Sequence, residues 1–262
     1  MRFSLGAIAL VSCALLASCS EEEIFNALSD RTCTENGTIQ FRNFTIENNM
    51  WNSVNTNGAA YSQCVAFTHL SATSWRIDWE WSWPLGLGNV KAYPQVYYGN
   101  KFGHDTGIAT HLPDQIDSLR DYTLYLNYAL GEASPNSTYS VSVQSWIHSS
   151  EVIAKENRLH GISVWLNQTP GFNPQVTFIQ DITIGGAVYG FYRGPVETWE
   201  HFIFVRRTPV TETHLHWNPF VDYLRSISAV AGSSYLASLE FGAEVVEGDA
   251  NFTVNGFSVA VD

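Results

Sequence analysis

Apolar and polar residues alternate along much of this chain, a pattern that predicts short β-strands with one buried and one exposed face. The alternation is clearest in five segments, at residues 122–128, 139–146, 202–205, 251–254 and 257–261. Residues that favour turns gather between such segments, with three clusters at 84–89, 131–138 and 169–174. Many short strands separated by turns predict an all-β domain, layered as a β-sandwich or jelly roll.

One segment has a helical period instead. Asn218 and Pro219 have the residue types of an N-cap and a first helical position. The apolar residues that follow are spaced to form one stripe of a helix: Phe220, Tyr223, Leu224 and Ile227. The sequence therefore predicts one short helix, and no linker, repeat or change of composition divides the domain.

The first residues have the features of a targeting segment rather than of folded structure. Arg2 is followed by the apolar run 5–16, which is too short to span a bilayer as a helix, and then by Leu16-Ala17-Ser18-Cys19. Small residues before a cysteine are typical of a bacterial lipobox, so we predict a signal peptide at 1–18 and lipidation of Cys19. An ordinary secretory signal with a cysteine near its cleavage site is the alternative.

Residues 19–31 include the acidic run Glu21-Glu22-Glu23 and are expected to form a tether, whereas residues 32–262 form the folded domain. Both interpretations of the first segment place the protein outside the cytoplasm. It is either secreted or held at the cell surface, in the second case as an outer-membrane lipoprotein.

Acidic residues outnumber basic ones in the 262-residue chain: Asp and Glu total 25, Lys and Arg total 13, and the formal charge is -12. That balance argues against nucleic acid and anionic membrane surfaces as partners, because both bind basic surfaces. A membrane contact is therefore expected only through a lipid at Cys19. Hydrophobic residues make up 45% of the chain and charged residues 15%, so the composition excludes a disordered protein and predicts a large core.

Cys33 and Cys64 are the two cysteines outside the signal segment and its end. In an oxidising compartment two such thiols most simply pair with each other, and closing that loop contributes roughly 3–4 kcal/mol on the chain-entropy estimate. The chain has no Cys-x-x-Cys motif and its eight histidines are scattered. His214 and His216 alternate on one strand face without a third partner, so we interpret them as surface residues and expect no metal and no cofactor.

Two strand segments carry residues that suit sugar binding or catalysis. The four tryptophans within 75–83 are two or four residues apart, so all of them face one side of a strand: Trp75, Trp79, Trp81 and Trp83. That side is either part of the core or a surface on which flat rings stack against sugars. Glu240 and Glu244 share a face of another strand, and Gly242 between them allows close approach by a backbone or a ligand.

Four motifs occur in an order that is typical of one enzyme family: Asn48-Asn49-Met50-Trp51, the Asp78-Trp79-Glu80-Trp81 strand, the Asn89-Val-Lys-Ala-Tyr93 turn and the segment from Tyr235 to Gly248. In these motifs the chain resembles glycoside hydrolase family 12, the compact endo-β-1,4-glucanases that act on cellulose, mixed-linkage glucan or xyloglucan. The resemblance runs from about Cys33 to the end, and the predicted helix at Pro219 corresponds to the single helix of the family.

The resemblance implies a jelly roll of two curved antiparallel sheets with one short helix and a cleft along the concave face. In such a cleft Trp51 is the stacking platform for one glucosyl unit, and Asn49, Trp79 and Trp81 line neighbouring subsites. It also implies the Cys33–Cys64 disulfide, a monomer without cofactors, and β-1,4-glucan or xyloglucan chains as ligands.

The family hydrolyses glycosidic bonds with retention, which requires two carboxyl groups about 5–5.5 Å apart. The resemblance assigns the acid/base to Glu244. The strand that normally carries the nucleophile matches His160–Leu166, and Gly161 occupies the nucleophile's place, so the chain resembles a divergent member of the family. Two functions stay open: a β-glucan hydrolase with an altered mechanism, and a cell-surface β-glucan-binding protein without catalysis.

Overall fold

The computed structural model describes residues 29–70, 75–103, 108–196 and 198–262. The predicted signal peptide, Cys19 and most of the predicted tether lie outside these residues. Residues 29–31, which we expected to belong to the tether, form a strand that pairs with residues 66–68. The tether prediction is wrong there, because these residues complete the edge of a sheet.

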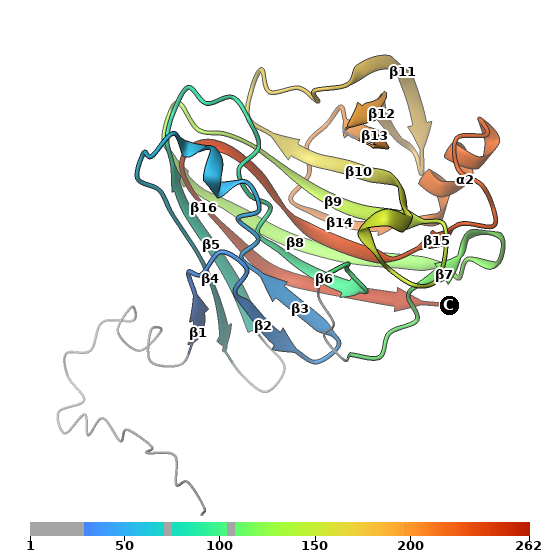
Figure 1. The fold of residues 1–262 in the computed structure, drawn as a ribbon, viewed down its shortest axis with the longest axis horizontal. Coiled ribbons are helices and arrows are strands. Elements are labelled where there is room, and N and C mark those ends of the chain that lie inside the picture. Colours follow the sequence, from blue (N-terminus) through green and yellow to red (C-terminus); the bar gives the residue numbers. More distant parts are fainter. Residues whose placement is uncertain (1–28, 71–74, 104–107, 197) are drawn as a thin grey trace, which may run out of the picture.

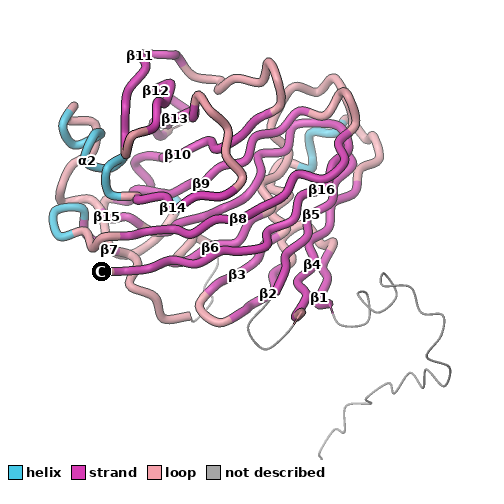
Figure 2. Tube along the Cα trace, turned by 180° about the vertical axis from the view of Figure 1, so that it is seen from behind, coloured by secondary structure: helices cyan, strands magenta, loops and turns pink. Residues whose placement is uncertain are grey.

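Nearly all of the regular structure is β-strand, arranged as two curved layers (Figures 1 and 2). The first layer contains β1 (Ser29–Thr32), β4 (Ser62–His69), β5 (Trp75–Trp83), β8 (Tyr122–Ala133), β14 (Glu212–His216) and the second half of β16 (Ser238–Val261). The second contains β2 (Thr38–Phe41), β3 (Phe44–Glu47), β6 (Gln95–Gly99), β7 (Asp114–Gln115), β9 (Thr138–His148), β10 (Arg158–Gln168), β11 (Thr177–Ile184), β12 (Ala187–Val196), β13 (Trp199–Arg206), β15 (Tyr235–Leu236) and the first half of β16. The predicted jelly-roll architecture is confirmed.

Two features differ from a pair of separate antiparallel sheets. The long strand β16 belongs to both layers: residues 238–247 pair with β6 and β9, and residues 248–261 pair with β5 and β8. The change of partner falls at Gly248, whose φ of +82° is in the region that favours glycine. In addition, β10 and β13 pair in parallel, which brings residues far apart in the sequence side by side.

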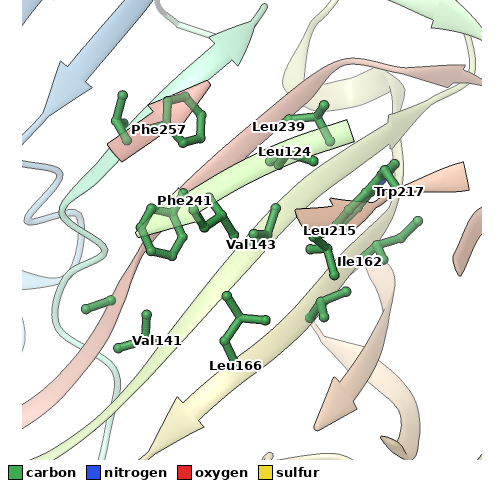
Figure 3. Packing of buried hydrophobic residues seen from close by; sticks show 14 of the residues in the cluster. Leu124, Val141, Val143, Ile162, Leu166, Leu215, Trp217, Leu239, Phe241 and Phe257 are labelled. Atoms are coloured by element: carbon green, nitrogen blue, oxygen red, sulfur yellow. The ribbon is translucent and has the colours of Figure 1, made fainter. Parts of the chain in front are cut away.

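The core lies between the two layers. Every second residue of each strand points into it, including Val141 and Val143 of β9, Ile162 of β10, and Leu239 and Phe241 of β16 (Figure 3). The alternate residues of β9, β10 and β16 therefore point to the outer face of the second layer.

The tryptophan-rich strand β5 faces this core. Trp79 is fully buried and stacks on Phe252, with ring centroids 4.8 Å apart, and Trp81 and Trp83 are buried in the same cluster. The prediction of a shared face is confirmed, but Trp79 and Trp81 do not bind substrate as expected. They lie in the first layer, on its inner side, where burial of the large rings stabilises the sandwich.

The helix α2 (Asn218–Ser226) is present where the sequence predicted it. Its buried side chains are Phe220, Val221 and Leu224, whereas Ile227, at the helix end, is 39% exposed. Asn218 is the first helical residue rather than the N-cap. Its side chain instead accepts a hydrogen bond from the Tyr122 amide and donates one to the Arg120 carbonyl, which ties the helix to the start of β8.

Three short 3-10 helices complete the described elements: η1 (Ser53–Thr56), η2 (Ile116–Ser118) and η3 (Lys155–Asn157). The predicted disulfide is confirmed, joining Cys33 to Cys64 of β4. In the part of the chain that the structure describes, no helix has the length and apolar character needed to cross a membrane.

Candidate active site

A cleft of about 490 Å³ lies on the outer face of the second layer. Its floor is formed by β9, β10, β13 and the first half of β16. These strands contribute the side chains that point away from the core. The walls are rich in aromatic rings: Trp51, Phe102, Trp146, Trp165, Phe172 and Trp199. A cleft lined by flat rings has the surface that a sugar chain needs, because ring faces stack on the apolar faces of sugars.

Asn49 and Trp51, two of the predicted substrate-binding residues, both line this cleft. They lie in the turn between β3 and η1, where Asn49 has a φ of +43° and its carbonyl accepts the Tyr93 amide. Trp51 is 56% exposed, which is unusual for so large an apolar ring. The turn therefore holds an indole in solvent at the edge of the cleft.

Glu244 lies on the cleft side of β16 and is 9% exposed. Its carboxylate accepts hydrogen bonds from the Gln144 side-chain amide at 2.6 Å and from the Ser140 hydroxyl at 3.2 Å. Burial raises the pKa of Glu244 to about 7, although these two hydrogen bonds oppose the rise. A carboxyl that keeps its proton near neutral pH is suited to proton donation.

Glu240 lies four residues earlier on the same face of β16 and also lines the cleft. Its carboxylate accepts the Ser238 hydroxyl at 2.6 Å and a hydrogen bond from the Trp146 side chain. Burial raises the pKa of Glu240, and the charge of nearby Lys101 opposes that rise. Sequence reasoning placed Glu240 on the face of Glu244 but assigned it no role.

Gly242 lies between the two glutamates, and its missing side chain has the consequence that the sequence suggested. A Cβ atom at Gly242 would be 2.2 Å from the Pro94 carbonyl oxygen, which accepts a hydrogen bond from the Ala243 amide. The segment around Pro94 can therefore lie directly against β16 only because residue 242 is glycine.

Position 161 faces the cleft, but it is not an open space. In the register of β9, β10 and β13, Gly161 lies between Trp146 and His201. A Cβ atom at Gly161 would be 2.7 Å from Cζ3 of Trp199, 3.2 Å from the His201 ring and 3.3 Å from the Trp146 ring. These three rings occupy the place where a carboxylate nucleophile would stand.

Trp146 and Trp199 pack edge to face, with centroids 4.9 Å apart, and the Arg158 guanidinium lies 4.8 Å from each ring. Ser163, two residues after Gly161, forms a 2.7 Å hydrogen bond with Nε2 of His201. Burial lowers the pKa of His201 to about 3, so this imidazole is neutral at ordinary pH. Sequence reasoning missed Trp199 and His201 because only the pairing of β10 with β13 brings them to Gly161.

We predict that Gly161→Ala lowers the free energy of unfolding by about 1–3 kcal/mol, because the added methyl group meets the Trp199 ring. Urea denaturation of Gly161→Ala, Trp199→Ala and the double variant measures the effect. The double variant should lose less than the sum of the single losses, since removing the indole makes room for the methyl group. Additive losses would mean that Trp199 is not the obstacle.

Comparison with known proteins identifies the family. The model of glycosyl hydrolase family 12 matches residues 42–262. The chain belongs to glycoside hydrolase family 12. Among curated family members, it is 25% identical to the xyloglucan-specific endo-beta-1,4-glucanase A of Emericella nidulans over 235 residues, covering 87% of this chain and 90% of that protein. It is 24% identical to endoglucanase S of Pectobacterium parmentieri over 192 residues, 71% of each protein.

Solved family 12 structures have the same fold. The native xyloglucanase from Bacillus licheniformis matches with a TM-score of 0.78 and 24% identity, covering 89% of this chain and 100% of that one. Endoglucanase 3 from Trichoderma harzianum matches with a TM-score of 0.77 and 20% identity, covering 89% and 98%. Within this family 12 fold, no cluster of three or more metal-ligating side chains occurs among the residues that the structure describes.

Proposed function

We propose that this family 12 protein hydrolyses β-1,4-glucan chains, with Glu244 as the proton donor to the leaving sugar. The observation that carries the proposal is the buried Glu244 carboxyl on the cleft floor, whose raised pKa of about 7 keeps it protonated where an ordinary glutamate is ionised. Gln144 and Ser140 hold its two oxygens from the neighbouring strand. Fixed orientation toward the cleft is what a general acid requires.

We infer that the substrate is a β-1,4-glucan, either unbranched or substituted as in xyloglucan. The aromatic cleft suits stacking of glucosyl units, and curated relatives include proteins named as xyloglucan-specific endo-beta-1,4-glucanases. The Cys33–Cys64 disulfide supports a location outside the cytoplasm, because disulfides persist in oxidising compartments. Attachment through Cys19 and a monomeric state complete the proposal.

Trp51 is proposed to bind one glucosyl unit by stacking. Trp51→Ala should then weaken binding of a xyloglucan oligosaccharide about 10- to 50-fold, the loss expected when a large ring no longer covers an apolar sugar face. Isothermal titration calorimetry measures the change. Val54→Ala is the matched control, since Val54 is 82% exposed in η1 and does not line the cleft. Equal affinities for both variants would exclude Trp51 as a platform.

One specific observation favours a second function, a β-glucan-binding protein without catalysis. No carboxylate stands at position 161, and the rings of Trp146, Trp199 and His201 fill that place. A covalent glycosyl-enzyme therefore cannot form there, and the Arg158 cation over the Trp146 and Trp199 rings is unfavourable to a positive charge on the sugar.

Release of reducing ends from xyloglucan, mixed-linkage glucan and carboxymethylcellulose distinguishes the two functions. The hydrolase releases new ends from at least one polymer, and the rate depends on Glu244. The binding protein retains the same polymer in affinity electrophoresis but releases none.

A further inference from the structure

Glu240 and Glu244 are the two acidic residues among the described side chains that line the cleft. Hydrolysis of a glycosidic bond by this cleft needs a proton donor and a second carboxyl that assists the attacking group. Since Gly161 supplies none, Glu240 is the remaining candidate in the described part of the chain.

The strand register places Glu240 on the side of the cleft where the nucleophile is missing. Glu244 pairs with Ser140 of β9, and Glu240 pairs with Gln144. Gly161 pairs with Trp146, two residues further along β9 on the same face. Glu240 is therefore nearer than Glu244 to the level of position 161 along the strands.

The Trp146 indole lies between Glu240 and position 161. One ring atom, Cζ3, is 3.3 Å from the point where a Gly161 Cβ atom would lie, and the same side chain donates a hydrogen bond to Glu240. The carboxylate of Glu240 thus lies one indole ring away from the nucleophile position.

The spacing along β16 favours a water molecule between the sugar and Glu240 over direct attack. Residues four apart on a strand are separated by roughly 13 Å along the backbone. Gln144, which pairs with Glu240, donates its side-chain amide to the Glu244 carboxylate, so the Gln144 side chain spans part of the distance between the backbones of the two glutamates. Carboxyls that leave room for a water molecule are typical of inverting glycosidases, in which they lie about 6.5–9.5 Å apart.

We infer that Glu240 is the second catalytic carboxyl of this protein and acts as the general base of an inverting hydrolysis; this inference rests on the proposed function. A water molecule bonds through its oxygen to the anomeric carbon and transfers a proton to the Glu240 carboxylate. The bond from that carbon to the leaving oxygen breaks, its electron pair stays on the oxygen, and Glu244 protonates that oxygen. Proton exchange with solvent then restores both residues.

The surroundings of Glu240 suit this role. The Ser238 hydroxyl and the Trp146 indole fix the orientation of the carboxylate, and Lys101, which pairs with Glu47 at 2.6 Å, provides a nearby positive charge. Burial raises the pKa of Glu240, and a carboxylate with a raised pKa is a stronger base than an exposed one.

The test compares the wild-type protein, Glu240→Gln and a control, Glu212→Gln, whose side chain is exposed on the first layer. Glu240→Gln should lower kcat on xyloglucan by about 10³-fold and leave oligosaccharide affinity within about threefold, because glutamine keeps the shape of the side chain but accepts no proton. Glu212→Gln should leave both unchanged. Proton NMR of the wild-type reaction should show the α-anomer of the new reducing end first, the product of inversion.

Hydrolysis by the wild type that persists in Glu240→Gln within about threefold, or that yields the β-anomer first, overturns the role of Glu240 and leaves the proposed hydrolase function intact. A wild-type protein that binds the oligosaccharide and releases nothing overturns both. Thermal unfolding of Glu240→Gln, together with its retained affinity, shows that a loss of kcat does not arise from misfolding.

Discussion

Replacing Glu244 with glutamine is expected to lower kcat for xyloglucan by about 10³- to 10⁴-fold, the loss expected when a general acid is removed. Glutamine preserves the size of the side chain and can still meet Gln144 and Ser140, which contact the Glu244 carboxylate. It has no proton to give to the departing sugar oxygen. Initial rates of reducing-end release measure the effect, and oligosaccharide affinity should change little.

A substrate with a better leaving group tests whether the function lost in Glu244→Gln is proton donation. A dinitrophenyl cello-oligosaccharide releases dinitrophenolate, a leaving group that needs no protonation. The rate at which Glu244→Gln cleaves this substrate should therefore be less than about tenfold below the wild-type rate. A substitution that merely disturbed the cleft would slow both substrates equally. Equal losses on the polymer and the aryl glycoside would therefore contradict the assignment of Glu244 as the acid.

The second large effect concerns stability and pH. Burial raises the pKa of Glu244 from 4.5 to about 7, so the folded protein keeps a proton that the unfolded chain has already released. Between these two pH values the folded state binds more protons, and its stability falls as the pH rises. The difference in pKa corresponds to roughly 3 kcal/mol of unfolding free energy, fully lost once the pH exceeds about 7.

Urea denaturation at pH 4.5, 6 and 8 tests this expectation. The difference in unfolding free energy between Glu244→Gln and the wild type should shift by about 3 kcal/mol in favour of the variant across this range, since glutamine carries no charge to bury. Glu212→Gln, with its side chain exposed, should follow the wild-type curve. Parallel curves for Glu244→Gln and the wild type would mean that the Glu244 carboxyl is not buried as described.

Local patterns in the sequence were sufficient to predict much of the fold. Alternation in segments such as 122–128 and 139–146 corresponds to β8 and β9, because a strand with one buried face has no other way to place its apolar residues. The spacing of Phe220 and Leu224 corresponds to the buried stripe of α2. Alternation alone does not show whether an aromatic face of a strand packs in the core or lines a binding cleft. Trp79 and Trp81 were therefore expected in the cleft but lie between the layers.

The candidate site shows the limit more clearly. Motifs identified Asn49, Trp51 and Glu244, and the structure brings all three to one cleft. Ser145 of β9 does not line the cleft. It lies on the face of Val143, toward the core, and its hydroxyl bonds to the Ser238 carbonyl. The residue beside Gly161 on the cleft face is instead Trp146.

Trp199 and His201 could not be found from sequence because their position depends on the parallel pairing of β10 with β13. That pairing joins residues about forty positions apart, and no local pattern specifies it. Its consequence is steric: the rings of Trp146, Trp199 and His201 leave little room for a side chain at position 161. Where the family carries a nucleophile, this chain therefore has packed aromatic and imidazole rings.

The central claim is that a family 12 cleft without a carboxylate at position 161 still breaks β-1,4-glucan chains through Glu244. The most direct measurement is the release of reducing ends from xyloglucan by the wild-type protein, with Glu244→Gln as the blank. We predict steady release by the wild type that falls as the pH rises through about 7, as Glu244 loses its proton. Saturable binding of xyloglucan with no release above the Glu244→Gln blank at any pH would contradict the claim.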